Sequence, residues 1–116
     1  MHEMGIAMQV VEIAAASIPP EMAGSRVERV NLKVGKLAAV VPDSLRFCYD
    51  VVIRDTPLAG SVLHIQEIPV TAECGDCGHS WTADRPEFRC GACGSGNVRI
   101  VSGQELEIIS IDIEDP

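Results

Sequence analysis

The sequence has 116 residues, of which 47% are hydrophobic, and it carries a formal net charge of −8 with a pI near 4.7. This length allows one modest hydrophobic core, and the apolar share excludes wholesale disorder. The acidic balance argues against nucleic-acid binding, and no apolar run approaches the ~20 residues needed to cross a bilayer. The first residues lack the basic stretch of a secretion signal, so we expect a soluble, cytoplasmic protein that binds neither nucleic acid nor membrane.

The first predicted elements are a helix and a strand. Residues 4 to 17 carry apolar side chains at helical spacing, and Pro19-Pro20 prevents the helix from continuing. We interpret Met4 and Met8 as fillers of the core, since methionine adapts to irregular gaps. In residues 27 to 37, valine and leucine alternate with polar residues, which predicts a strand with one buried face.

A second helix and two further strands follow. Pro42-Asp43-Ser44 opens a helix over residues 43 to 54, and Cys48 lies on its apolar stripe as an expected small core residue. Residues 61 to 69 and 105 to 112 are rich in β-branched side chains and predict strands. The expected fold is therefore α+β: two helices on a three-stranded sheet, with a cysteine-rich module inserted between the last two strands.

Two Cys-x-x-Cys pairs dominate that module. Cys74-Gly-Asp-Cys77 and Cys90-Gly-Ala-Cys93 each allow two sulfur atoms to turn inward on one tight loop. Four thiolates facing one another suit the tetrahedral preference of zinc, and four protein ligands close the coordination sphere. We predict a structural zinc ribbon; two disulfides and a four-cysteine iron site are the alternatives. The glycines expected in the turns are Gly75, Gly78, Gly91 and Gly94.

These elements predict a division into two domains. Residues 1–69 and 104–116 are expected to form an α/β domain, and residues 70–103 the zinc-binding ribbon. The ribbon is expected to contain a short strand over Val98 to Val101.

The start of the chain, Met1-His2-Glu3, offers a second set of metal ligands. At a free N-terminus, the Met1 amine, the His2 amide nitrogen and the His2 imidazole can close fused chelate rings on one ion. Nitrogen ligands of this kind favour square-planar nickel or copper. Glu3 can add a carboxylate, its own amide, or a hydrogen bond that orients the imidazole.

The whole pattern resembles the HypA/HybF family of nickel chaperones for the maturation of nickel–iron hydrogenase. The resemblance spans essentially the full chain. Its motifs are the initial Met1-His2-Glu3, a strand ending Val-Gly-Lys-Leu, the Pro-Asp-Ser helix, the double Cys-x-x-Cys and Gly103-Gln-Glu-Leu-Glu-Ile. The resemblance implies the α/β nickel domain and zinc ribbon described above.

The resemblance also implies ligands and partners. Nickel would be bound transiently through His2 and the adjoining N-terminal backbone with Glu3 assisting, and zinc would be bound structurally. The zinc ligands implied are Cys74, Cys77, Cys90 and Cys93. A HypB-type GTPase would supply nickel for delivery to the hydrogenase large subunit, and some relatives also serve urease.

Two further histidines are candidate metal ligands. Some family members recruit a further histidine to nickel, and His64 and His79 are the candidates in this chain. No Ser-His-Asp arrangement, phosphate loop or paired-carboxylate motif stands out, so we expect a metallochaperone and not an enzyme. The alternative function is that of a zinc-ribbon adaptor for protein interactions.

Overall fold

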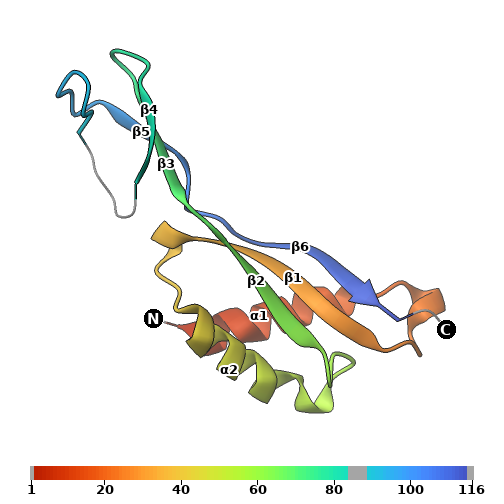
Figure 1. Cartoon of the computed structure of the whole chain (residues 1–116). Coiled ribbons are helices and arrows are strands. Elements are labelled where there is room, and N and C mark those ends of the chain that lie inside the picture. Colours follow the sequence, from red (N-terminus) through yellow and green to blue (C-terminus); the bar gives the residue numbers. More distant parts are fainter. Residues whose placement is uncertain (1, 84–88, 115–116) are drawn as a thin grey trace. The chain divides into compact units, whose positions relative to one another are not determined.

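A computed structural model describes residues 2–83 and 89–114, and it shows an α+β chain (Figure 1). The described residues contain two α-helices and two three-stranded sheets, which confirms the fold class expected from the sequence. The chain divides into two compact units. The first unit comprises Met1–Leu32, Val40–Gln66 and Glu107–Pro116, and the second comprises Lys33–Ala39 and Glu67–Leu106.

The first unit contains both helices, α1 (Glu3–Ala16) and α2 (Pro42–Val52), which pack against each other. Each begins and ends within two residues of the predicted boundary. In α2, Leu45 and Tyr49 are fully buried one turn apart, as an apolar stripe requires. Among the described residues, no helix has the length and apolar character that crossing a bilayer takes.

The buried stripe of α1 differs from the predicted one. It consists of small residues at helical spacing: Ala7, Val10, Val11 and Ala14. Met4 and Met8 are 43% and 57% exposed and Ile13 is 56% exposed, so the interpretation of the two methionines as core fillers is wrong. Close packing of the helix is achieved by the alanines and valines, and the larger side chains lie outside this stripe. Cys48 on α2 is half-buried and not a full member of the core.

The sheet of the first unit has the strand order β2-β1-β6, formed by β1 (Val27–Gly35), β2 (Val62–Ile68) and β6 (Leu106–Ile113). Alternate residues of β1 are buried, so one face of the sheet belongs to the core and the other is polar. On the polar face, Asn31 Nδ2 donates to Ser110 Oγ at 3.0 Å and to Asp112 Oδ2 at 3.1 Å. In the core, the Tyr49 hydroxyl is hydrogen-bonded to the hydroxyl of the buried Ser61 at 2.5 Å.

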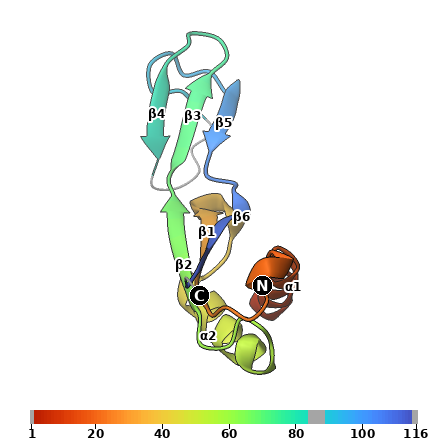
Figure 2. The ribbon, with the colours of Figure 1, turned by 90° about the vertical axis from the view of Figure 1, so that its right-hand side faces the viewer.

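The second unit is built on an antiparallel sheet of order β4-β3-β5 (Figure 2). Its strands are β3 (Val70–Cys74), β4 (Ser80–Ala83) and β5 (Val98–Ser102). Of these three strands, only β5 is predicted from the sequence. Pro69 separates β2 from β3 because proline has no N–H to donate to a strand ladder.

Two glycines in the second unit approach each other closely. A Cβ atom on Gly35 would lie 2.1 Å from both the carbonyl carbon and the oxygen of Gly103. Gly103 itself has a φ of 112°, a conformation that favours glycine. Two backbone hydrogen bonds fix the contact, from Gly35 N–H to the oxygen of Glu105 and from Leu37 N–H to the oxygen of Gly103, both at 2.7 Å. The segment after β1 is thereby bound to the segment between β5 and β6.

Candidate metal centre

The two Cys-x-x-Cys pairs form loops with the same backbone hydrogen bonds. In the first loop, Cys74 N–H donates to the oxygen of His79 at 2.8 Å, and Gly78 N–H donates to the oxygen of Cys74 at 3.0 Å. The second loop repeats both bonds at Cys90 and Gly94, each at 2.8 Å. Gly78 and Gly94 have φ values of 78° and 76°, so the turn requires glycine at these positions. The glycine spacing in the sequence therefore reflects a real conformational need at these two positions.

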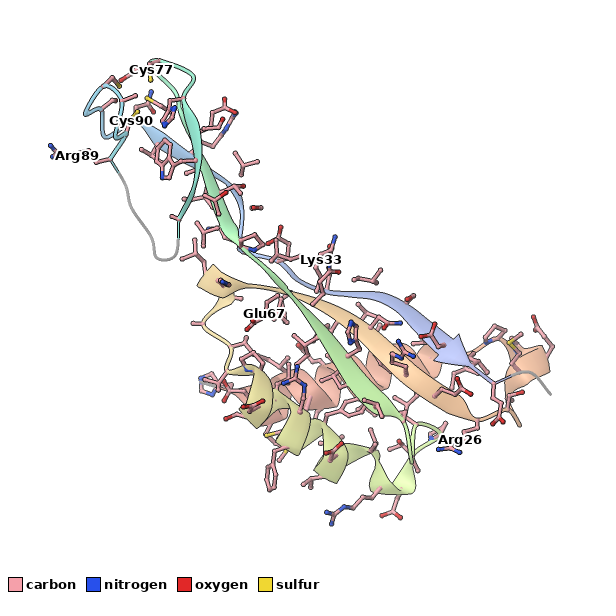
Figure 3. All side chains as sticks on the ribbon, viewed as in Figure 1. Arg26, Lys33, Glu67, Cys77, Arg89 and Cys90 are labelled. Carbon is pink, nitrogen blue, oxygen red and sulfur yellow. The ribbon has the colours of Figure 1, made fainter. Side chains whose placement is uncertain are left out.

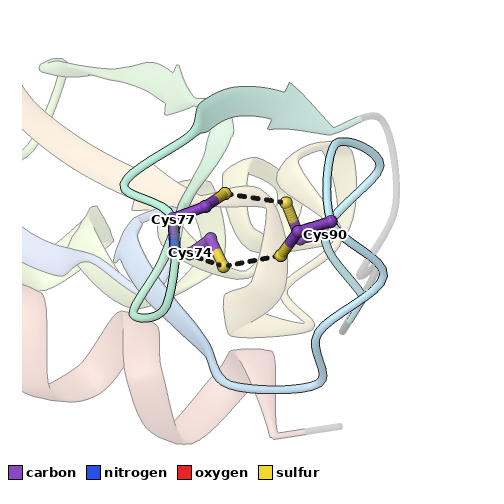
Figure 4. A group of neighbouring side chains, drawn as sticks. Cys74, Cys77 and Cys90 are labelled. Atoms are coloured by element: carbon purple, nitrogen blue, oxygen red, sulfur yellow. Dashed lines mark hydrogen bonds between the residues drawn. The ribbon is translucent and has the colours of Figure 1, made fainter.

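The loops bring all four predicted cysteines together. Their sulfur atoms all lie within 4.8 Å of one another, with 3.6 Å between Cys74 and Cys93 and 3.6 Å between Cys77 and Cys90 (Figure 4). Tetrahedral zinc with Zn–S bonds of about 2.3 Å requires sulfur atoms about 3.8 Å apart. A disulfide would need a bond of about 2.05 Å, so these cysteines are unbonded thiols. The geometry fits a tetrahedral metal ion with four thiolate ligands.

The electrostatics of the loops favour thiolates at some positions and oppose them at others. The backbone N–H groups of Cys77 and, to a lesser degree, Asp76 donate to Cys74 Sγ and lower the pKa of the Cys74 thiol to about 7. The Ser95 amide acts in the same direction on Cys93, yet the nearby Cys74 sulfur raises the pKa of the Cys93 thiol to about 12. Neighbouring sulfur atoms therefore resist simultaneous ionisation unless a bound cation supplies compensating charge.

Side chains outside the cysteine set connect the two loops. The Asp76 carboxylate accepts hydrogen bonds from the Ser95 hydroxyl and from Asn97 Nδ2, which lower the pKa of the Asp76 carboxyl. Asn97 also uses its backbone oxygen to accept the N–H of Gly75 at 2.8 Å. Gly75 has no positive φ, but a Cβ atom on it would lie 2.6 Å from Asn97 Nδ2, so a larger residue there would displace the Asn97 side chain. No motif in the sequence predicts this network, and its only signal is the presence of short polar residues beside the cysteines.

His64 and His79, the two further candidate nickel ligands, do not belong to a metal-binding cluster among the described residues. His79 is exposed and stacks on Trp81, with 5.6 Å between the ring centroids. His64 is an exposed residue of β2. Within residues 2–83 and 89–114, the four cysteines are the only group of three or more histidine, cysteine or acidic side chains placed to share a metal ion. Figure 3 shows Cys77 and Cys90 together at the loop end of the second unit.

The predicted nickel ligands lie at the start of α1. Met1 is outside the described residues. His2 immediately precedes the helix, is exposed, and makes no side-chain capping hydrogen bond, so its imidazole is available to an ion. Glu3 is half-buried, and its Oε2 accepts a hydrogen bond from Val41 N–H at 3.5 Å. Of the two predicted ligand residues that the structure describes, His2 is therefore exposed and Glu3 is half-buried.

Comparisons with known proteins agree with a small metal-carrying chain of this fold. Residues 1–113 match the family described as "Hydrogenase/urease nickel incorporation, metallochaperone, hypA". The chain is 53% identical over 115 residues to a hydrogenase maturation factor HypA of Desulfosudis oleivorans, covering 99% of this chain and 100% of that protein. It is 51% identical to a HypA of Desulfatibacillum aliphaticivorans, covering 100% of this chain and 89% of that protein.

Solved structures show the same fold. A solution structure of a HypA protein superposes with a TM-score of 0.71 at 22% identity, covering 98% of this chain and 97% of the other. The solution structure of the nickel metallochaperone HypA from Helicobacter pylori gives a TM-score of 0.67 at 23% identity, with 97% of both chains covered. The match over residues 1–113 places the chain in the class of nickel-incorporation metallochaperones, and the fold agrees with it. The chain belongs to the HypA family, which confirms the resemblance found in the sequence.

Proposed function

We propose that this protein carries nickel to a nickel enzyme and binds the ion at Met1-His2-Glu3. The observation that carries this proposal is the match to the metallochaperone family over residues 1–113. His2 supports the proposal, because its side chain is exposed and makes no capping hydrogen bond to α1, so an ion can approach the imidazole without displacing another partner. Nickel is the cargo, and the ion must be held reversibly.

Ligands that belong to one short segment suit reversible binding. Micromolar affinity corresponds to roughly 8 kcal/mol, which is enough to hold an ion against water and small enough to allow release. Ligands from one short segment, the Met1 amine and the His2 amide and imidazole, can be exchanged one at a time by an acceptor protein. Glu3 assists from the first turn of α1.

We further propose that the four cysteines hold zinc and that this zinc is structural. Cys74, Cys77, Cys90 and Cys93 fill all four tetrahedral positions, so no position is open for a substrate. When bound, zinc supplies positive charge that keeps four crowded thiols ionised. An iron site would have the same geometry, and absorption distinguishes the two, because zinc thiolates are colourless and iron thiolates are not.

The proposed partners are a HypB-type GTPase that supplies nickel and the hydrogenase large subunit that receives it, with urease maturation as a second possible client. Membership of a hydrogenase and urease nickel-incorporation family supports these partners. A purified GTPase of this type should co-elute with the protein in size-exclusion chromatography and transfer nickel within the complex. Separate elution under conditions that retain a known complex would contradict the partner assignment.

The nickel site is tested by calorimetry and absorption on protein with an authentic N-terminus. We expect His2→Ala to lose the site, and a tag before Met1 to weaken binding and change the d–d spectrum, because the terminal amine becomes an amide. His64→Ala is the matched control, since it removes another exposed histidine. If His2→Ala binds nickel as tightly as the native protein and with the same spectrum, the ion is held elsewhere and the proposal fails.

A further inference from the structure

The start of α2 lacks the capping groups that helices usually provide for themselves. Its N-cap residue is Val41, whose side chain cannot accept a hydrogen bond, and no side-chain cap bond is present. In a capping box, an acidic residue at the third helical position reaches back to the N–H of the N-cap residue. That position in α2 is Ser44. The N–H of Val41 is therefore left open to an acceptor from another part of the chain.

Glu3 provides this acceptor. Its Oε2 lies 3.5 Å from the N–H of Val41, so a carboxylate from the first turn of α1 occupies the place of the missing capping partner. Figure 1 shows the starts of the two helices near each other within the first unit. A carboxylate is favourable at the positive end of a helix, and this one lies at the beginning of both helices. Glu3 is half-buried, as a residue held between two helices would be.

We propose that Glu3 is a positioning residue for nickel and not a ligand: its carboxylate is bound to the start of α2 and thereby fixes the place where His2 leaves α1. This inference rests on the proposed nickel site and assigns one of several possible roles to Glu3. His2 is the residue directly before Glu3, and its backbone oxygen accepts the N–H of Ile6 at 3.0 Å. A fixed Glu3 therefore restricts the backbone to which the imidazole and the ligating amide of His2 belong.

Glutamine and alanine substitutions separate the two roles. Glu3→Gln keeps an oxygen for Val41 N–H but removes the charged donor that would ligate nickel. Glu3→Ala removes both. Replacing a residue that orients a metal ligand typically lowers metal affinity by about tenfold or more, so Glu3→Ala should weaken nickel binding by about tenfold. Glu3→Gln should stay close to native affinity and keep the native d–d spectrum. Glu12→Ala, at an exposed glutamate of the same helix, is the matched control and should bind nickel normally.

The experiment uses the full chain with an authentic N-terminus and adds one readout without nickel. In NMR spectra, the Val41 amide should be protected from exchange in native protein and in Glu3→Gln, and should lose protection in Glu3→Ala. If Glu3→Gln loses as much affinity as Glu3→Ala while its Val41 amide stays protected, the carboxylate is a ligand and the inference is wrong. An unchanged Val41 amide in Glu3→Ala also overturns it. Failure of the nickel site itself appears separately, as native affinity in His2→Ala.

Discussion

The close approach of Gly35 and Gly103 allows a stability prediction in the second unit. In Gly35→Ala, the added methyl group would lie 2.1 Å from the carbonyl group of Gly103 and 2.5 Å from the nitrogen of Gln104. These are backbone atoms and cannot rotate away as a flexible side chain would. The two segments must therefore separate, which lengthens or breaks the hydrogen bonds from Gly35 and Leu37, both 2.7 Å in the native protein.

The expected cost follows from these contacts. Overpacking a tight site typically costs 1–3 kcal/mol, and loosening two hydrogen bonds adds about 1 kcal/mol each, so we expect a loss of about 3 kcal/mol. Trp81, the single tryptophan of the chain, lies on β4 and reports on the second unit by fluorescence. With a denaturant slope of 1–2 kcal/mol/M, the urea midpoint should fall by roughly 2 M at fixed free zinc.

Gly91→Ala is the matched control for this experiment. Gly91 belongs to the same unit, has no positive φ, and a Cβ atom there would meet nothing within 4 Å. Its unfolding curve should overlie the native curve. If Gly35→Ala also overlies the native curve, the close approach is not maintained in solution and the reasoning fails.

Three further substitutions test other parts of the fold. Cys74→Ser should lose zinc, as measured by elemental analysis, and its second unit should unfold, because a structural metal contributes folding energy. Circular dichroism should still show the two helices. Retained zinc would contradict binding by four thiolates. Tyr49→Phe should cost about 1 kcal/mol by leaving the buried Ser61 hydroxyl without its partner. Burial raises the pKa of Tyr49 above 10.0, so the stability gained from keeping its hydroxyl neutral is complete below pH 10 and is lost as the pH rises through the raised pKa. Tyr49→Phe should therefore lose less stability at alkaline pH than the native protein does. Cys48→Ala should cost about 1 kcal/mol or less at this half-buried site and leave nickel and zinc content unchanged.

Local sequence signals predicted the elements that depend on local physics. Helical spacing and the two prolines after it determine α1, and strict alternation determines β1. The spacing of the cysteines was sufficient to predict that four sulfur atoms would meet. Each of these features depends on a stretch of at most twenty residues, as from Cys74 to Cys93, and over such a stretch the sequence pattern and the structure agree.

The errors arose where distant parts of the chain decide the outcome. The period of α1 does not by itself show which residues face the core, so the sequence favours a core position for Met8 although this residue is exposed. Strand β4 is short, and its pairing with β3 depends on the turn at Cys74. Gly35 and Gly103 are far apart in the sequence, and nothing around either indicates that they meet. The contact of Glu3 with Val41 joins two helices and likewise has no local signal.

The burial of the four cysteines bears on the rate at which the ribbon exchanges its metal. Cys74 and Cys90 are buried, whereas Cys77 and Cys93 are exposed residues. Each exposed cysteine has its sulfur 3.6 Å from that of a buried cysteine on the opposite loop. A competing chelator must therefore begin at Cys77 or Cys93, and the remaining ligands still hold the ion on both loops. With zinc on the ribbon and nickel at the N-terminus, as proposed above, zinc exchange should proceed stepwise from one side and slowly, so that the ribbon would keep its zinc while the N-terminus binds and releases nickel many times.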